Sequence, residues 1–183
     1  MTNYKLDEKG SSLIQRFEGI HDGDLTIIGL QPKMDASGWW TEGWGHLMLI
    51  NGKPIKGIAN KQLAYDNITI HTIEEADRHF LADITPFENN INALGLSANQ
   101  GQFNSQISFI YNCGYKAFLG STLCARIKAK AQPKSIELAF LMWNKSSGVV
   151  YDGLIARRMT ESVMFNTGEL LFYSCHNGIL ATV

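Results

Sequence analysis

The hydrophobic pattern of the chain changes its period twice, and this change limits the folds that the chain can adopt. Residues 5–20 carry an apolar stripe at helical spacing, formed by Leu6, Leu13, Ile14 and Phe17. From 21 to about 70 the pattern is that of short strands between glycines, and after that helical spacing returns. The sequence therefore predicts an α+β fold, in which a small, irregular sheet lobe interrupts a mainly helical chain.

The length of 183 residues suits one domain or two small lobes. We expect a single domain over residues 1–183. Within it we expect a β lobe at about 21–70 and a larger, all-helical lobe made of 1–20 and 71–183, with a cleft between the lobes.

A long helix is expected to join the two lobes. The pattern Thr72-x-x-Glu75 is a capping box, which favours a helix start. Pro86 has no N–H to donate inside a helix, and Thr85-Pro86 is itself typical of a helix start. We therefore expect a kink or a restart of this helix at 85–86.

Other local signals mark turns and helix starts. Asn51-Gly52 favours a tight turn between strands. Ser97-x-x-Gln100 is a second capping pattern, and Ser121 precedes a short helix. Two more helices are expected at 134–144 and 154–166. The apolar tail 169–183 is expected to add a helical turn or a strand.

The charge and the cysteines exclude some classes of function. A formal net charge of −1 argues against a general nucleic-acid-binding protein. Residues 1–111 hold eight Lys or Arg against thirteen Asp or Glu, whereas residues 112–168 hold eight against three. The basic second part suits contact with an anionic polymer, and a solvated mixed surface is an equally good interpretation. The three cysteines show no metal-ligand spacing and are interpreted as reduced thiols: Cys113, Cys124 and Cys175.

Two carboxylates in separate settings form the candidate reaction centre. Glu18 lies in the last turn of the first predicted helix, where the apolar stripe and the negative end of the helix dipole both disfavour its ionised form. Asp35 begins the run Asp35-Ala-Ser-Gly-Trp-Trp-Thr41-Glu-Gly-Trp-Gly-His46. An acid and a base held apart are what glycoside hydrolysis requires. Taken alone, Glu18 is more simply interpreted as an ordinary exposed glutamate.

Two features of that run have more than one interpretation. Its tryptophans, Trp39, Trp40 and Trp44, suit either a sugar-binding surface or the core of a small lobe. His46, taken alone, suits a metal ligand or a general base.

Motifs that follow one another along the chain resemble the phage-type lysozymes, the endolysins that lyse bacterial hosts. The stretch 6–19 resembles their opening helix, and Thr41-Glu-Gly-Trp-Gly-His46 resembles their Thr-Ile-Gly-Tyr-Gly-His signature, with Glu42 in place of Ile. Further matching motifs are Gln102-Phe103, 109–114, 117–123, Trp143-Asn-Lys145, Gly153-Leu154, Arg157-Arg158 and 165–168. The resemblance covers about residues 5–168 and implies a lysozyme-like fold.

The resemblance implies three catalytic residues. Glu18 would be the acid, Asp35 the base, and Thr41 the neighbour of the attacking water. Asp35 precedes Thr41 by the family's spacing, but extra residues separate it from Glu18. Asp22 and Asp24 lie in this enlarged loop, 20–34, and are rival bases.

The resemblance also implies residues for substrate contact and support. Contacts to the glycan would come from Leu47, Tyr111 and Ser121, although simple packing explains Leu47 and Tyr111 as well. His46 becomes a structural partner of Asp83 rather than a metal ligand. Arg157 would pair with Glu18 and favour its ionised form, against the effects of burial and dipole. The resemblance implies no metal and no cofactor.

The implied activity is hydrolysis of the β-1,4 bond between N-acetylmuramic acid and N-acetylglucosamine in peptidoglycan, with inversion. Two alternatives remain: a lytic transglycosylase that uses Glu18 alone, and a non-catalytic protein that binds the cell wall.

The expected location follows from the absence of targeting signals. The first ten residues have no apolar core, and no apolar run has the length of a membrane span. We expect a monomer that is made in the host cytoplasm, does not insert stably into membranes, and acts on peptidoglycan strands after release. A holin-like partner that permeabilises the membrane would provide this release.

Overall fold

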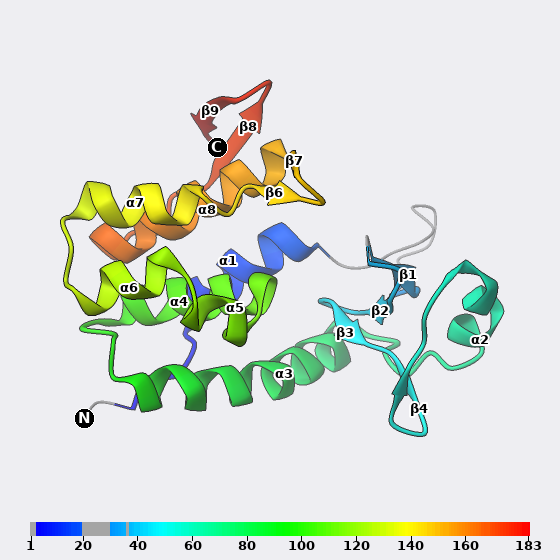
Figure 1. Ribbon diagram of the computed structural model, residues 1–183. Helices are drawn as coiled ribbons and strands as arrows, with labels where there is room; N and C mark the ends of the chain where they lie inside the picture. Colours follow the sequence, from blue (N-terminus) through cyan, green and yellow to red (C-terminus); the bar gives the residue numbers. More distant parts are fainter. Residues whose placement is uncertain (1–2, 20–29, 36) are drawn as a thin grey trace. The chain divides into compact units, whose positions relative to one another are not determined.

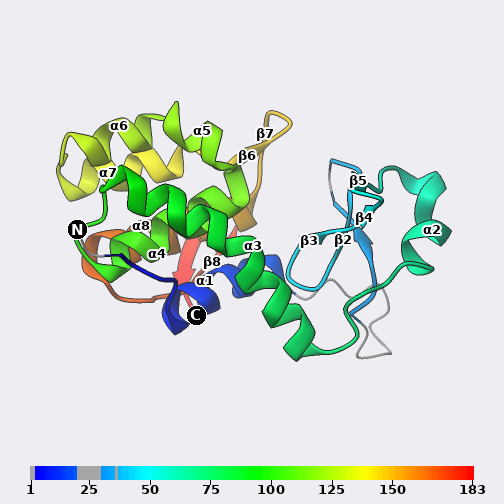
Figure 2. The ribbon, with the colours of Figure 1, turned by 90° about the horizontal axis from the view of Figure 1, so that it is seen from below.

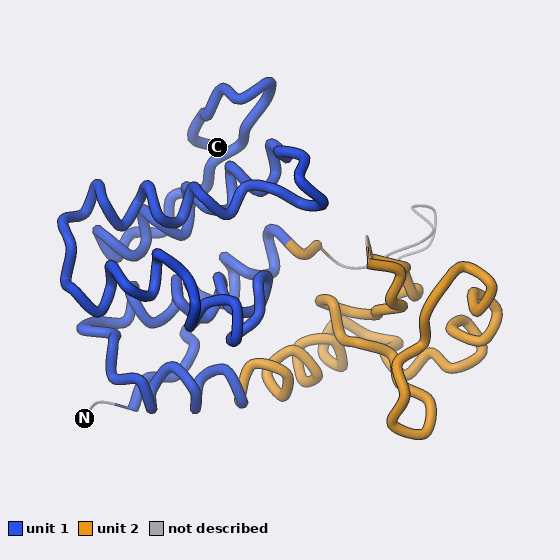
Figure 3. Tube along the Cα trace, in the orientation of Figure 1, with its two compact units in different colours: residues 1–17, 86–183 blue, residues 18–85 orange. Residues whose placement is uncertain are grey.

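The computed structural model describes residues 3–19, 30–35 and 37–183, and it divides the chain into two compact units (Figure 3). Unit 1 comprises residues 1–17 and 86–183, and unit 2 comprises 18–85. The rival bases Asp22 and Asp24 lie outside the described residues.

Unit 1 is mainly helical (Figure 1). Its helices are α1 (Glu8–Glu18, whose last residue belongs to unit 2), the second half of α3 (Ile73–Leu94), α4 (Gln100–Cys113), α5 (Tyr115–Leu119), α6 (Thr122–Lys128), α7 (Pro133–Leu141) and α8 (Asp152–Thr167). Two hairpins join β6 (Lys145–Ser146) to β7 (Val149–Val150) and β8 (Tyr173–His176) to β9 (Ile179–Thr182). The sequence predicted an all-helical lobe here. The two hairpins show that unit 1 is not all-helical.

Phe109 lies at the centre of an aromatic core in unit 1. Helix α4, which carries it, packs along α8. The Phe109 ring meets Phe118, Phe140 and Trp143 edge to face, with centroids 5.9, 5.9 and 5.3 Å apart. Such aromatic pairs add to the stabilisation that comes from burying apolar area, so α4 is fixed against its neighbours.

Helix α3 runs without interruption through Pro86. Of the two outcomes expected at 85–86, a kink or a restart, the restart is therefore wrong. The missing Pro86 N–H removes one ladder bond, while the Thr85 hydroxyl donates to the Leu81 carbonyl one turn earlier. The boundary between the two units nevertheless falls between Thr85 and Pro86, rather than near residue 70.

Side-chain caps explain two other helix starts. Ser121 Oγ accepts the Cys124 N–H at 3.0 Å and opens α6, as predicted. The predicted cap at Ser97 is wrong, because α4 begins after Asn99, whose side chain accepts the Gln102 N–H at 2.9 Å. Asn and Ser are about equally good caps, so the motif alone could not separate these two starts.

Unit 2 contains two small antiparallel sheets. The first has the order β1 (Lys33–Met34), β2 (Trp40–Glu42), β3 (His46–Leu47), and the second pairs β4 (Leu49–Ile50) with β5 (Lys53–Pro54). The Asn51-Gly52 turn joins β4 to β5 with both residues at positive φ, as predicted.

A short helical segment completes unit 2, formed by the 3₁₀ turn η1 (Ile58–Asn60) and α2 (Lys61–Tyr65), which lie near β4 and β5 (Figure 2). Ala64 from α2 packs with Trp40, Met48 and Ile55 in a buried cluster. Trp40 is therefore a core residue, which decides between its two interpretations.

The C-terminal tail forms a strand hairpin rather than a helical turn. Strand β8 packs against α8, and the Asn177-Gly178 turn has positive φ at both residues. The Asp152 carboxylate at the start of α8 accepts the N–H groups of Asn177 and Gly178 at 2.7 and 3.1 Å. These bonds lower the pKa of Asp152, with the Gly178 bond contributing most.

Within the described ranges, no helix is both long enough and apolar enough to cross a membrane.

Candidate active site

Asp35 closes the turn that joins β1 to β2. Its Oδ1 accepts the N–H groups of Ser37 and Trp39, each at 2.8 Å, and its own N–H donates to the Trp39 carbonyl at 2.8 Å. A carboxylate that accepts two backbone N–H groups through one oxygen has a fixed direction. The turn therefore orients the half-buried Asp35 side chain. Both of these side-chain bonds end on Oδ1 and not on Oδ2.

Thr41 lies in the centre of the same sheet. It pairs with Lys33 of β1 on one side and with Leu47 of β3 on the other. Its side chain is buried, and its hydroxyl donates to the Lys33 carbonyl at 3.2 Å. Because the hydroxyl proton is used in this way, the Thr41 oxygen can only accept a further hydrogen bond.

His46 contacts Asp83 of α3 in the pairing that the family resemblance implied. The distance from His46 Nδ1 to Asp83 Oδ2 is 2.8 Å. This hydrogen bond raises the pKa of His46 against the opposing effect of burial, and the charges of Asp83 and Glu42 raise it further. The His79 ring lies 4.6 Å from the His46 ring, centroid to centroid.

Alternate residues of the β2–β3 hairpin form hydrogen bonds with residues 69–70, which precede α3, and with α3 itself. Glu42 accepts the N–H of Thr69 and of Ile70 at 3.0 and 3.1 Å and the Thr69 hydroxyl at 2.6 Å. Trp44 Nε1 donates to Asp77 at 2.7 Å. With the contact at His46, these bonds join the β2–β3 hairpin to Thr69–Ile70 and to the first half of α3.

The sequence analysis did not predict the structural role of Glu42. It replaces the Ile of the related motif, and its side chain is 1% exposed. A buried carboxylate needs hydrogen-bond partners, and Thr69-Ile70 supplies three. The partners lie 27 and 28 residues away, so no local pattern could have indicated them.

Glu18 is the last residue of α1 and is half-buried. Gly19 follows at positive φ, which ends the helix as expected. The preceding residue, Phe17, has its ring 5.9 Å from the guanidinium carbon of Arg157.

Arg157 belongs to a buried ionic cluster on α8 and α4. Its Nε is 3.2 Å from Glu161 Oε1, and its Nη2 donates to the Ser108 carbonyl at 3.2 Å. Glu161 also accepts the Ser108 hydroxyl at 2.7 Å and pairs with Arg158 at 3.0 Å. The spacing of three and four residues between the arginines and Glu161 is a helical ion-pair signal, which could have identified Glu161 from the sequence. The pairing of Arg157 with Glu18 stays a prediction.

The three predicted substrate contacts lie in different settings. Leu47 pairs with Thr41 across the sheet. Tyr111 on α4 is half-buried and meets Phe87 edge to face at 6.1 Å. Ser121 is buried, and its hydroxyl donates to the Phe118 carbonyl at 2.6 Å while it caps α6. Their roles toward a glycan remain predictions.

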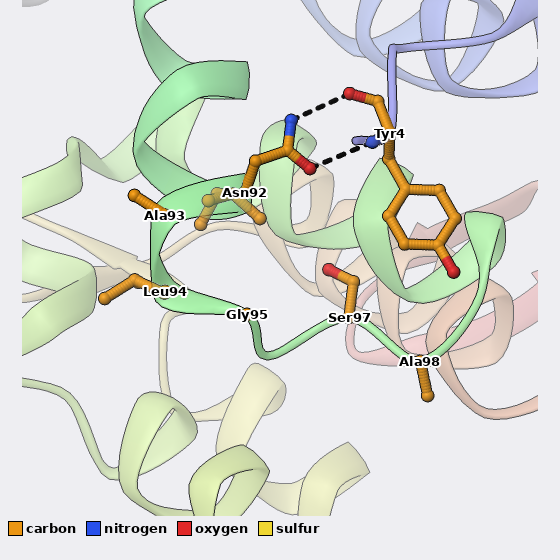
Figure 4. A pocket seen from close by; sticks show the side chains of 8 residues that line it. Tyr4, Asn92, Ala93, Leu94, Gly95, Ser97 and Ala98 are labelled. Carbon is orange, nitrogen blue, oxygen red and sulfur yellow. Dashed lines mark hydrogen bonds between the residues drawn. The ribbon is translucent and has the colours of Figure 1, made fainter. Parts of the chain in front are cut away.

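A pocket of about 430 Å³ lies elsewhere, between the N-terminal segment and the end of α3 (Figure 4). The Asn92 side chain bonds to both the N–H and the carbonyl of Tyr4, at 3.0 and 2.8 Å. Ser97 lines the same pocket. Its lining contains no predicted site residue, so we do not place the reaction there.

In the part of the chain that the structure describes, no three His, Cys, Asp or Glu side chains gather in a way that could hold a metal ion.

Comparison with known proteins identifies the family of this chain. Residues 25–161, most of the chain, match the family described as Phage lysozyme. The chain belongs to the phage lysozyme family. The match includes Asp35, Thr41 and Arg157, whereas Glu18 precedes it.

Relatives of this phage lysozyme family member include endolysins. The endolysin of Bacillus phage B103 is 30% identical over 165 residues, which cover 90% of this chain and 55% of that protein. The chain thus spans about half the length of the Bacillus phage endolysins that it matches.

Solved structures show the same lysozyme-like α+β fold. The endolysin from Escherichia coli O157:H7 phage FAHEc1 is 27% identical with a TM-score of 0.69, covering 92% of this chain and 97% of that one. The muramidase domain of SpmX from Asticaccaulis excentricus is 25% identical with a TM-score of 0.65, covering 90% and 99%.

Proposed function

We propose that this protein is a peptidoglycan-degrading muramidase that hydrolyses the β-1,4 bond between N-acetylmuramic acid and N-acetylglucosamine. Membership of the phage lysozyme family supports the reaction class. The observation that carries the residue assignment is the Asp35 turn, which holds an oriented carboxylate on the small sheet that contains Thr41.

Two carboxyl groups divide the reaction in this proposal. Glu18 protonates the glycosidic oxygen as the bond to the anomeric carbon breaks. Asp35 takes a proton from a water molecule that attacks the opposite face of the sugar, which inverts the anomeric configuration. The product is a free reducing muramic acid end.

Thr41 positions the water. Its hydroxyl proton is used on the Lys33 carbonyl, so its oxygen accepts a hydrogen bond from the water and leaves the second water proton for Asp35. Thr41 is buried and its strand is paired on both sides. Its hydroxyl oxygen is therefore already in a fixed position before the substrate binds.

The test is a comparison of wild type with Glu18→Gln and Asp35→Asn on outer-membrane-permeabilised bacteria and on purified peptidoglycan. Each variant should lose at least about 100-fold in the rate at which reducing ends appear, the scale of one general acid or base. Both replacements keep the size of the side chain, and circular dichroism checks that each variant is folded. Clearing by Glu18→Gln at the wild-type rate would overturn the assignment.

The products separate this mechanism from its rivals. Proton NMR of the newly formed ends should show the inverted anomer first. Anhydro sugar without a reducing muramic end, together with an active Asp35→Asn variant, would indicate a lytic transglycosylase instead. Binding to peptidoglycan without bond cleavage would indicate a non-catalytic protein.

The substrate also defines where the protein works. We propose that it reaches peptidoglycan as a monomer after release from the host cytoplasm, through a holin-like partner. Deletion of such a partner in the host should delay lysis without changing the activity of the purified protein.

A further inference from the structure

Lys56 is held beside the turn that carries Asp35. The Gly57 N–H donates to the Gly38 carbonyl at 2.7 Å, and the Trp40 N–H donates to the Ile55 carbonyl at 3.0 Å. Lys56 itself forms a bridge with Trp39, the residue whose N–H binds Asp35. Backbone pairing on both sides therefore fixes the position of Lys56 relative to the proposed base.

The Lys56 side chain is directed by an aromatic ring. Its ammonium group lies 4.3 Å from the centre of the Trp39 ring, within the range of a cation–π contact. The chain reaches this position over Gly38, where a Cβ atom would lie 3.9 Å from Lys56 Cε. A lysine held in this way has lost part of its freedom before any ligand binds, which lowers the entropy cost of binding.

The pocket that Lys56 lines differs in charge from the acidic unit to which it belongs. Unit 2 holds ten Asp or Glu and five Lys or Arg in sequence. A pocket of about 350 Å³ on this unit is lined by Lys53, Lys56 and Asn60 together with apolar side chains such as Ile55, and no Asp or Glu occurs among the described residues that line it. In the described ranges, Lys56 makes no ion pair with a carboxylate. The pocket therefore suits an anionic group attached to a partly apolar molecule.

Peptidoglycan offers such groups in one part of its structure. The sugars of the strand are neutral, because the lactyl carboxyl of each muramic acid is used in the amide bond to a short peptide. The negative charges are the free carboxylates of these peptides, which also carry apolar side chains.

We propose that Lys56, with Lys53 and Asn60 at the same pocket, binds the carboxylates of the peptides that peptidoglycan carries on its muramic acid residues. This subsite rests on the function proposed above, and Lys56 connects it to the turn that carries the proposed base through its bridge with Trp39. The subsite makes the protein select strands with free peptide carboxylates over strands without them.

The test uses soluble peptidoglycan fragments in three forms: intact, with the peptide carboxyls converted to methylamides, and stripped of peptides by an amidase, which frees the lactyl carboxylates. Lys56→Gln should raise KM for intact fragments about three- to fivefold at low salt with kcat unchanged, the size expected for one exposed charge pair. It should leave KM for the methylamide form unchanged. Lys56→Arg should keep the wild-type preference.

Lys61→Gln is the matched control. Lys61 belongs to the same unit but does not line the pocket, and its ammonium lies 5.4 Å from the centre of the Tyr65 ring, so the control removes the same charge from a similar contact. It should leave all three KM values unchanged.

Several outcomes would overturn the subsite. One is an equal rise of KM for intact and methylamide fragments in Lys56→Gln. Another is the same rise for stripped strands, which would identify the lactyl carboxylate as the partner. If wild type releases no reducing ends from any form, the proposed function fails, and calorimetric binding of intact and methylamide fragments to wild type and Lys56→Gln then decides the subsite by itself.

Discussion

Glu42 stands next to the proposed water-positioning residue in the sequence and is fully engaged inside unit 2. Its carboxylate satisfies three donors of Thr69 and Ile70. Neighbouring residues of a strand point to opposite faces, so Glu42 can anchor the strand while Thr41 remains available on the other side. Glu42 and Thr41 thus lie on the same strand with their side chains on opposite faces.

Removal of this anchor should be costly. Glu42→Ala would leave the buried Ile70 N–H without its acceptor and free two donors of the exposed Thr69 to bind water, and we expect the free energy of unfolding to fall by about 2 kcal/mol. Urea denaturation measures this change. Glu74→Ala, which removes an exposed carboxylate in the first turn of α3, should cost less than about 1 kcal/mol. Equal losses in the two variants would show that the buried bonds of Glu42 contribute nothing.

The pairing of His46 with Asp83 should make stability depend on pH. The pKa of His46 is raised in the folded protein above its ordinary value of 6.5. Its contribution is therefore fully present below about pH 6.5 and is lost as the pH rises through the higher folded pKa. Asp83→Asn should cost about 1 kcal/mol more at pH 5.5 than at pH 8.5.

Two measurements check this dependence. Urea denaturation of wild type and Asp83→Asn at both pH values gives the difference in stability. NMR titration of the His46 ring should show a lower pKa in the variant. A cost that is the same at both pH values would contradict the role of the charged imidazole.

Single residues differ in how far the sequence could predict them. His46 and Asp83 lie 37 residues apart, and only the family resemblance connected them. Composition and period could not distinguish the ring of Trp39 from that of Trp40. The Trp39 ring contacts the Lys56 ammonium, whereas Trp40 lies in the core. Contacts between residues far apart in the sequence form only in the folded chain. A local sequence pattern therefore cannot predict them.

At the scale of elements, α3 shows how tertiary packing overrides a local signal. Pro86 normally disfavours a helix interior, but the flanking turns bury Ile84 and Glu88. Glu88 binds the N-terminal segment through the Leu6 N–H at 2.7 Å. These contacts continue the helix past the proline.

Relief of this local cost should stabilise α3. Pro86→Ala restores an N–H that can donate to the Ala82 carbonyl, and we expect a gain of about 1–2 kcal/mol, less than the full proline penalty because alanine also frees the unfolded chain. Thermal denaturation measures the gain. Thr85→Ala, at the neighbouring exposed position, should change stability by no more than about 0.5 kcal/mol. A loss of stability in Pro86→Ala would mean that the ring itself makes needed contacts.

Across the whole molecule, the order of a helical, a sheet and a second helical region was predictable because hydrophobic period reports secondary structure directly. The place of the boundary was not. The first half of α3 is bound to unit 2 through Trp44–Asp77 and His46–Asp83, so it belongs with the sheets although its period is helical. Period identifies an element but not the partner against which it packs.

The tail after Gly168 touches the helix that carries the proposed acid. The Phe172 ring lies 6.4 Å from the Phe17 ring and 5.8 Å from the Arg16 guanidinium carbon. Both contacts fall in the last turn of α1, next to Glu18. A truncation directly after α8 would therefore remove Phe172 and its two contacts, and with them a support of the helix that carries Glu18.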